Sequence, residues 1–133
     1  MRYGSIVLEK KEYVILKQLL ALSDSEKASS RKQSITRLKN ELESAIILDE
    51  AELPTDVIRF NTEVIVGTSD GWENSFTLVS PTENDFANKK VSVLSPMGLA
   101  IIGYAKGDVI DWDFPGGTKA LEIKEVKQTQ QVN

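Results

Sequence analysis

The sequence of 133 residues contains neither cysteine nor histidine. Without cysteine there is no disulfide, no thiol nucleophile and no thiolate ligand for a metal. Without histidine there is no imidazole base, no Ser-His-Asp triad and no zinc site of the usual type. Any catalysis would have to use carboxylates, lysine, tyrosine or an active site supplied by a partner. We therefore expect no resident metal, no cofactor and no enzymatic activity of its own.

Long apolar runs and an excess of basic charge are also missing. No segment approaches the roughly 18 uninterrupted apolar residues of a membrane span, and the first residues lack the pattern of a signal peptide. A net charge of −4 and a pI near 4.9 argue against a protein that coats nucleic acid. We expect a cytoplasmic protein of bacterial type, with no membrane contact and no direct sequence-specific DNA binding.

The composition changes near Pro54. Residues 1–52 contain nine basic and nine acidic side chains, whereas residues 53–133 contain seven basic and eleven acidic ones, so the net charge belongs to the second part. All the prolines, and all the glycines except Gly4, lie from residue 54 onward. We therefore predict a helical part over residues 1–52 and a domain of strands and turns over residues 53–133.

The first part has the pattern of two amphipathic helices, over residues 9–22 and 31–48. Apolar residues recur in them at spacings of three and four: Tyr13, Leu16 and Leu20 in the first, and Ile35, Leu38, Leu42 and Ala45 in the second. The polar segment between them predicts a turn. The result is a short antiparallel coiled-coil hairpin with arms of about 14–18 residues, or roughly 20–27 Å.

The second part has a period of two, which is typical of strands. Five short runs alternate in this way and are separated by turn residues: residues 63–66, 76–79, 91–94, 110–114 and 121–124. Residues 96–103 are apolar, begin with proline and end with glycine, which predicts one short helix packed on an antiparallel sheet. The fold class is therefore α+β.

Few residues are candidates for chemistry. Asp108, Asp111 and Asp113 could form a magnesium site, but a turn residue followed by two solvated strand positions explains them better. Asp24 and Glu26, at the tip of the predicted hairpin, either present carboxylates to a partner or cap a helix.

Aromatic residues give a second set of candidates. Trp112 and Phe114 share a strand face with Ile110 and are expected in the core, whereas Trp72, beside a turn glycine, is the better candidate for an exposed contact. These residues alone favour a protein–protein interaction module over an enzyme.

The second part also carries a distinctive motif set. Residues 92–103 contain the pattern Ser-Pro-x-Gly-x-Ala-x-x-Gly, followed by Gly-Asp at 107–108 and Pro-Gly-Gly at 115–117. This set resembles the C-terminal domain of the GreA/GreB transcript-cleavage factors, over roughly residues 57–127. Residues 52–57 and 38–45 are similar to the short-hairpin branch of that family, the Rnk-like regulators of nucleoside diphosphate kinase.

The resemblance implies an FKBP-like C-terminal domain that binds RNA polymerase at the coiled coil on the rim of its secondary channel. By resemblance, Ser95, Pro96, Met97 and Gly98 belong to the polymerase-binding surface. Family hairpins about twice as long carry carboxylates to the polymerase magnesium, so a short hairpin implies a non-catalytic competitor of the longer factors. The alternatives are a cleavage-stimulating factor that uses Asp24 and Glu26, and a generic FKBP-like interaction or prolyl isomerase module.

Overall fold

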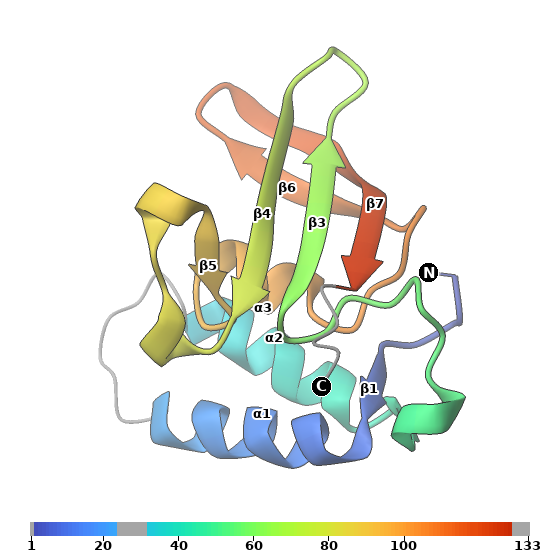
Figure 1. Ribbon diagram of the computed structural model, residues 1–133. Coiled ribbons are helices and arrows are strands. Elements are labelled where there is room, and N and C mark those ends of the chain that lie inside the picture. The colour runs from blue at the N-terminus through green and yellow to red at the C-terminus, as the bar shows by residue number, and fades with distance from the viewer. Residues whose placement is uncertain (1, 24–31, 129–133) are drawn as a thin grey trace.

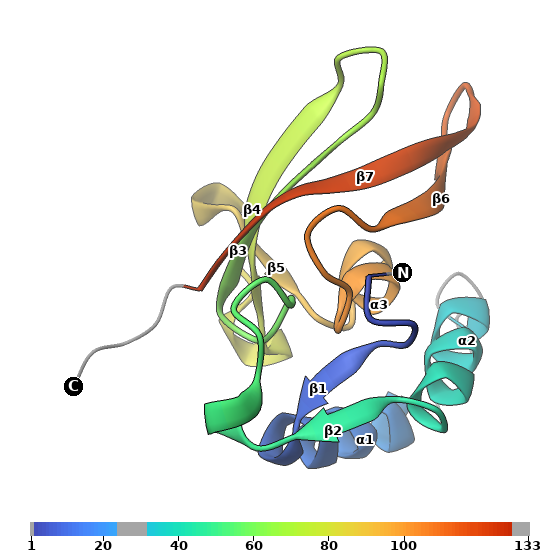
Figure 2. The same ribbon diagram turned by 90° about the vertical axis from the view of Figure 1, so that its right-hand side faces the viewer.

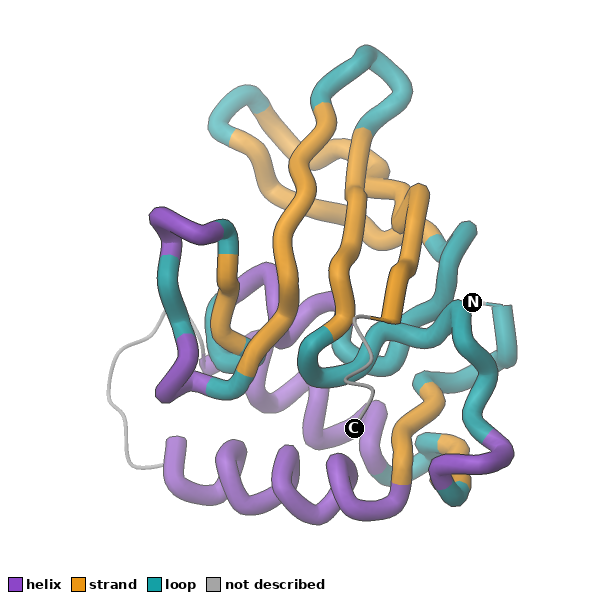
Figure 3. The backbone as a smooth tube through the Cα atoms, in the orientation of Figure 1, coloured by secondary structure: helices purple, strands orange, loops and turns teal. Residues whose placement is uncertain are grey.

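The computed structural model describes residues 2–23 and 32–128 and confirms the α+β class. Two helices near the N-terminus lie along the base of a curled five-stranded sheet, and a third helix packs between them and the sheet (Figure 1; Figure 3). No helix within the described ranges is long and apolar enough to cross a bilayer.

The first two helices are α1 (Lys10–Ser23) and α2 (Lys32–Leu42). Leu16 and Leu20 of α1 and Leu38 of α2 are almost completely buried, as their spacing predicts. The two helices run in opposite directions in Figure 1, and α2 contacts both α1 and the third helix, α3 (Pro96–Ile101). The predicted antiparallel pair is therefore present over the described residues.

The prediction that the second helix continues to Leu48 is wrong. α2 ends at Leu42, the chain turns through residues 43–44, and Ile46–Leu48 form the strand β2, which pairs in parallel with β1 (Val7–Glu9). The turn is closed by a hydrogen bond of 3.2 Å from the Ser44 amide to the Glu41 carbonyl. Because β-branched side chains favour strands, the consecutive isoleucines at 46 and 47 suit this extended partner of β1.

Each of the five predicted runs overlaps a strand of the main sheet, although the third, residues 91–94, extends two residues beyond its strand. In the order β5-β4-β3-β7-β6, its strands are β5 (Lys90–Ser92), β4 (Glu73–Val79), β3 (Thr62–Gly67), β7 (Gly117–Gln128) and β6 (Val109–Phe114). Every pairing is antiparallel except that of β4 with β5, which is parallel. The parallel pair arises because the connection between them contains two short 3-10 helices, η2 (Pro81–Glu83) and η3 (Phe86–Asn88), and does not reverse the chain as a hairpin would.

The predicted short helix is α3 (Pro96–Ile101). Ser95 caps its N-terminus and Pro96 occupies its first turn, where the missing amide hydrogen costs nothing. Gly103 follows the helix with φ +83°, the left-handed conformation that ends many helices. Helix α3 lies beside α2, as the turned view shows (Figure 2).

The largest cluster of buried apolar side chains combines residues from both predicted domains, 1–52 and 53–133. It includes Leu16, Leu20 and Leu38 of the helices together with Leu78, Leu121 and Ile123 of the sheet. A smaller cluster joins Val7 of β1 to Val57 and Ala105. The division of the chain into two domains between residues 52 and 53 remains a prediction. In the structure, side chains from both predicted domains pack into this one cluster.

Candidate partner-binding site

The segment Ser95–Gly98 is shaped by backbone contacts at the start of α3. The Ser95 hydroxyl donates to the Ser92 carbonyl at 2.7 Å and accepts from the Gly98 amide at 3.0 Å. An added Cβ at Gly98 would lie 2.7 Å from Val93 Cα, so only glycine fits there. The segment therefore exposes Pro96, half-buries Ser95 and Met97, and buries Gly98.

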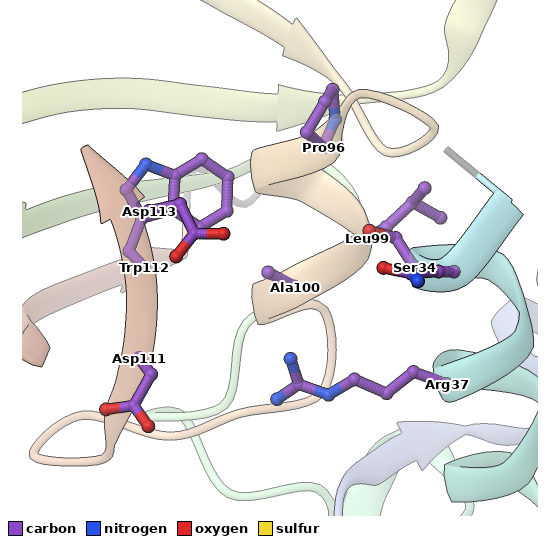
Figure 4. Close-up of a pocket in the computed structure, with 9 residues that line it drawn as sticks. Ser34, Arg37, Pro96, Leu99, Ala100, Asp111, Trp112 and Asp113 are labelled. Atoms are coloured by element: carbon purple, nitrogen blue, oxygen red, sulfur yellow. The ribbon is translucent and has the colours of Figure 1, made fainter. Parts of the chain in front are cut away.

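A pocket of about 400 Å³ opens beside Pro96. Three elements form it: α2 on one side, α3 at the base and β6 on the other side (Figure 4). Its lining residues are Gln33, Ser34, Arg37, Pro96, Leu99, Ala100, Asp111, Trp112 and Asp113. The sequence gives no sign of this pocket, because its walls lie far apart along the chain.

The β6 wall of the pocket is acidic and aromatic. Asp111 and Asp113 are exposed, as the strand alternation predicts, and the half-buried Trp112 between them packs against the core. The Asp113 carboxylate accepts a hydrogen bond of 2.6 Å from the Thr118 hydroxyl. Within the described residues, no ion pair involves either aspartate.

The α2 wall of the pocket contributes one basic side chain. Arg37 extends from α2 across the pocket toward β6 (Figure 4), and its guanidinium donates to the Tyr104 hydroxyl at 3.4 Å. That hydroxyl donates in turn to Glu41 at 2.8 Å, and burial raises the pKa of Tyr104. Sequence reasoning missed Arg37, because helical spacing shows only that it lies off the apolar stripe.

Asp108 does not join the other two aspartates. It is 4% exposed, and its carboxylate accepts hydrogen bonds from the Ala105 amide at 2.9 Å and from the Arg2 amide. It is a turn residue, as expected, but a buried one that ties down the N-terminal segment. Over residues 2–23 and 32–128, no group of three or more acidic side chains could hold a metal ion.

The remaining candidates lie elsewhere. Asp24 and Glu26 fall outside the described residues. Trp72 is 40% exposed at the turn between β3 and β4, in agreement with the prediction, and its ring meets the half-buried Phe114 edge-on with centroids 5.1 Å apart.

Comparisons with known proteins agree with this architecture. Residues 53–128 match the family described as "Transcription elongation factor, GreA/GreB, C-term". A relative named transcription elongation factor GreA, from Clostridium botulinum (strain Eklund 17B / Type B), is 34% identical over 95 residues, which is 71% of this chain and 59% of the relative. The chain thus spans less than two thirds of that relative's length.

Two further proteins are similar over more of their own length. The regulator of nucleoside diphosphate kinase from Escherichia coli (strain K12) is 37% identical over 92 residues, which is 68% of each chain. The solved structure of a prokaryotic transcription elongation factor GreA/GreB from Nitrosomonas europaea superposes with a TM-score of 0.75 at 30% identity. That superposition covers 93% of this chain and 98% of the other.

Proposed function

The chain belongs to the GreA/GreB family of transcription elongation factors, and from this we propose that it is a non-catalytic transcription regulator that binds RNA polymerase. It docks at the coiled coil on the rim of the secondary channel and competes there with longer Gre-type factors. Its place of action is then the bacterial cytoplasm. The docking surface is the exposed part of Ser95–Gly98, with Pro96 at its centre.

One observation carries the proposal: the segment that matches the C-terminal domain of the family, residues 53–128, is joined to two short helices. Helix α1 has 14 residues and α2 has 11, so at 1.5 Å per residue they are about 21 and 17 Å long. Both helices also contribute to the core shared with the sheet, which keeps them close to the rest of the fold. A hairpin of this size supports blocking of the channel entrance over delivery of carboxylates to a distant polymerase magnesium.

The alternative is stimulation of transcript cleavage. It is supported by Asp24 and Glu26, two carboxylates in the segment between α1 and α2, and by the relatives named GreA. In that mechanism the tip carboxylates would help to hold a second metal at the polymerase active site, where a water attacks the RNA.

Two assays separate these functions. Purified chain should bind the RNA polymerase of its source organism, displace a labelled Gre factor, and leave the RNA in backtracked complexes uncut. Absence of binding would refute the proposal. RNA cleavage that is lost in an Asp24→Ala/Glu26→Ala variant would establish the alternative.

A matched pair of proline variants tests the docking surface. Pro96→Ala removes an exposed ring at the start of α3, and Pro115→Ala removes an exposed ring from the turn between β6 and β7. Polymerase binding should weaken in Pro96→Ala and stay unchanged in Pro115→Ala. Equal binding by both variants would exclude Pro96 from the interface.

A further inference from the structure

The pocket beside Pro96 holds opposite charges on facing walls. Asp111 and Asp113 lie on β6, and Arg37 reaches toward them from α2 (Figure 4). No ion pair between the two walls occurs in the described part of the chain, where the hydrogen bond of Arg37 is to the Tyr104 hydroxyl. The pocket is therefore open space between separated charges.

The base of the pocket favours the stem of a long side chain. Leu99 and Ala100 of α3 form its apolar floor, and Trp112 of β6 also lines it. An aliphatic stem can lie on such a surface while its charged end remains solvated or paired. A guanidinium or ammonium group at the end of that stem gains charge-assisted hydrogen bonds to the carboxylates of Asp111 and Asp113.

Arg37 adds a second requirement. A partner that brought only a cation would leave Arg37 without an opposite charge in the pocket, and one that brought only an anion would leave the two aspartates without one. A partner with one basic and one acidic side chain side by side satisfies both walls. Neighbouring turns of a helix display such a pair, because residues three or four apart lie on one face.

We infer that this pocket receives an oppositely charged pair of side chains from a helix of RNA polymerase, with the basic one between Asp111 and Asp113 and the acidic one against Arg37. The inference rests on the proposed function and adds a specificity-determining site to it. It also gives the short hairpin a role in binding, because Arg37 belongs to α2 whereas the aspartates belong to the C-terminal segment.

Neutralising either wall should weaken binding. We expect Asp111→Asn/Asp113→Asn and Arg37→Gln each to lower polymerase affinity about tenfold, and Arg37→Glu to lower it further. The controls Glu122→Gln and Lys127→Gln remove exposed charges of the same signs from β7 and should leave affinity unchanged. Because exposed charge pairs are screened by salt, the pocket variants should also show a shallower dependence of affinity on ionic strength.

Photo-crosslinking locates the contact independently. A photoreactive phenylalanine analogue in place of Gln33, on the pocket rim, should form an adduct with polymerase, and the same analogue in place of Glu122 should not. If the native chain binds polymerase but the pocket variants bind equally well, or no adduct forms at position 33, this inference is wrong and the proposed function stands. If the native chain does not bind at all, the proposed function fails first.

Discussion

At the scale of single residues, the approach of α3 to the strand before it depends on Gly98. An added Cβ there would lie 2.7 Å from Val93 Cα and closer still to the Ser92 carbonyl oxygen. Both are backbone atoms, which cannot rotate away as a side chain can. The position of Pro96 on the surface thus depends on a glycine two residues later.

Gly98→Ala should destabilise the protein by about 2–3 kcal/mol, because α3 must shift away from residues 92–93. Gly116→Ala is the matched control, since a Cβ at that position meets nothing within 4 Å, and its effect should stay within about 0.5 kcal/mol. Urea unfolding followed by fluorescence measures both. A Gly98 variant as stable as the control would mean that the helix moves without cost.

Asp70 illustrates how the tips of two hairpins are joined by charge. Hydrogen bonds from Lys119 Nζ at 2.7 Å and from the Thr68 hydroxyl lower the pKa of Asp70 to about 2. A carboxyl whose pKa is lower in the folded than in the unfolded state stabilises the fold above its unfolded pKa, near 3.9. That contribution is lost as the pH falls from about 4 to about 2.

Lys119→Met should therefore raise the pKa of Asp70 toward its usual value, and Thr68→Val should raise it less, because Lys119 makes the larger contribution. Carboxyl carbon shifts in an NMR titration give this pKa directly. An unchanged pKa in Lys119→Met would show that the ion pair is absent in solution.

The sequence predicts the role of a residue correctly where that role follows from the alternation along one strand, and fails where it depends on residues from other segments. Alternation along residues 110–114 correctly separates the exposed Asp111 and Asp113 from the buried Ile110. It could not show that Asp108 is buried, because its partners are backbone amides of Ala105 and the distant Arg2. Arg37 was unpredictable for the same reason, since the residues opposite it come from β6.

At the scale of elements, sequence periodicity identified the helices and the strands of the main sheet but misplaced the end of α2. Leu42 and Ala45 continue the apolar spacing, yet the helix stops at Leu42 and Ala45 packs against the core from an irregular segment. The helix ends there because the following residues form β2 and pair with β1, with Val7 opposite Ile46 in the register. A pairing across 39 positions leaves no local signal in a helical pattern.

The first helix is held to the rest of the fold by Arg59, in the segment before β3. Its guanidinium binds Glu12 of α1 at 2.9 Å and Glu50 of the 3-10 helix η1 (Glu50–Glu52) at 2.7 Å. The side chains of Arg59 and Glu12 are only 13% and 18% exposed. Burial raises the pKa of Glu12 even though Arg59 opposes the change, whereas Arg59 lowers the pKa of Glu50.

Arg59→Met should cost about 3 kcal/mol at neutral pH, because it leaves Glu12 charged and mostly buried without a partner. The double variant Arg59→Met/Glu12→Gln should recover part of that loss, since the uncompensated charge is gone. Urea unfolding of the native chain and both variants measures these differences. A double variant less stable than Arg59→Met would contradict the expectation.

The same variant has a defined pH dependence. When the pKa of a carboxyl is raised in the folded state, the free energy of unfolding falls as the pH rises through that pKa. In the Arg59→Met variant, Glu12 therefore destabilises the fold least when it is protonated. Glu50, whose pKa Arg59 lowers, contributes in the native chain above its unfolded pKa and loses that contribution as the pH falls. The difference in the free energy of unfolding between the native chain and the Arg59→Met variant should therefore become smaller as the pH falls from about 7 to about 4.

At the scale of the whole molecule, the hairpin helices and the sheet share one core. Leu38 of α2 is 1% exposed and belongs to the same cluster as Leu121 and Ile123 of β7. Composition and period could separate residues 1–52 from 53–133, because those properties are local. They could not show that the two parts pack together, because packing depends on which faces meet in space.

A shared core predicts that the molecule unfolds in one step. Trp72 and Trp112 are the only tryptophans, and both lie after residue 53, so fluorescence reports on the C-terminal part while far-ultraviolet circular dichroism includes the helices. Leu38→Ala, although it lies in α2, should destabilise by about 2–5 kcal/mol and move both signals to the same lower urea midpoint. Thr36→Ala, on the exposed side of α2, is the control and should leave the midpoint nearly unchanged.

If Leu38→Ala shifted only the dichroism, the helices would be an independent unit, and Arg37 would then have no fixed position opposite β6. Coincident transitions would instead mean that the pocket walls are held together by the core itself.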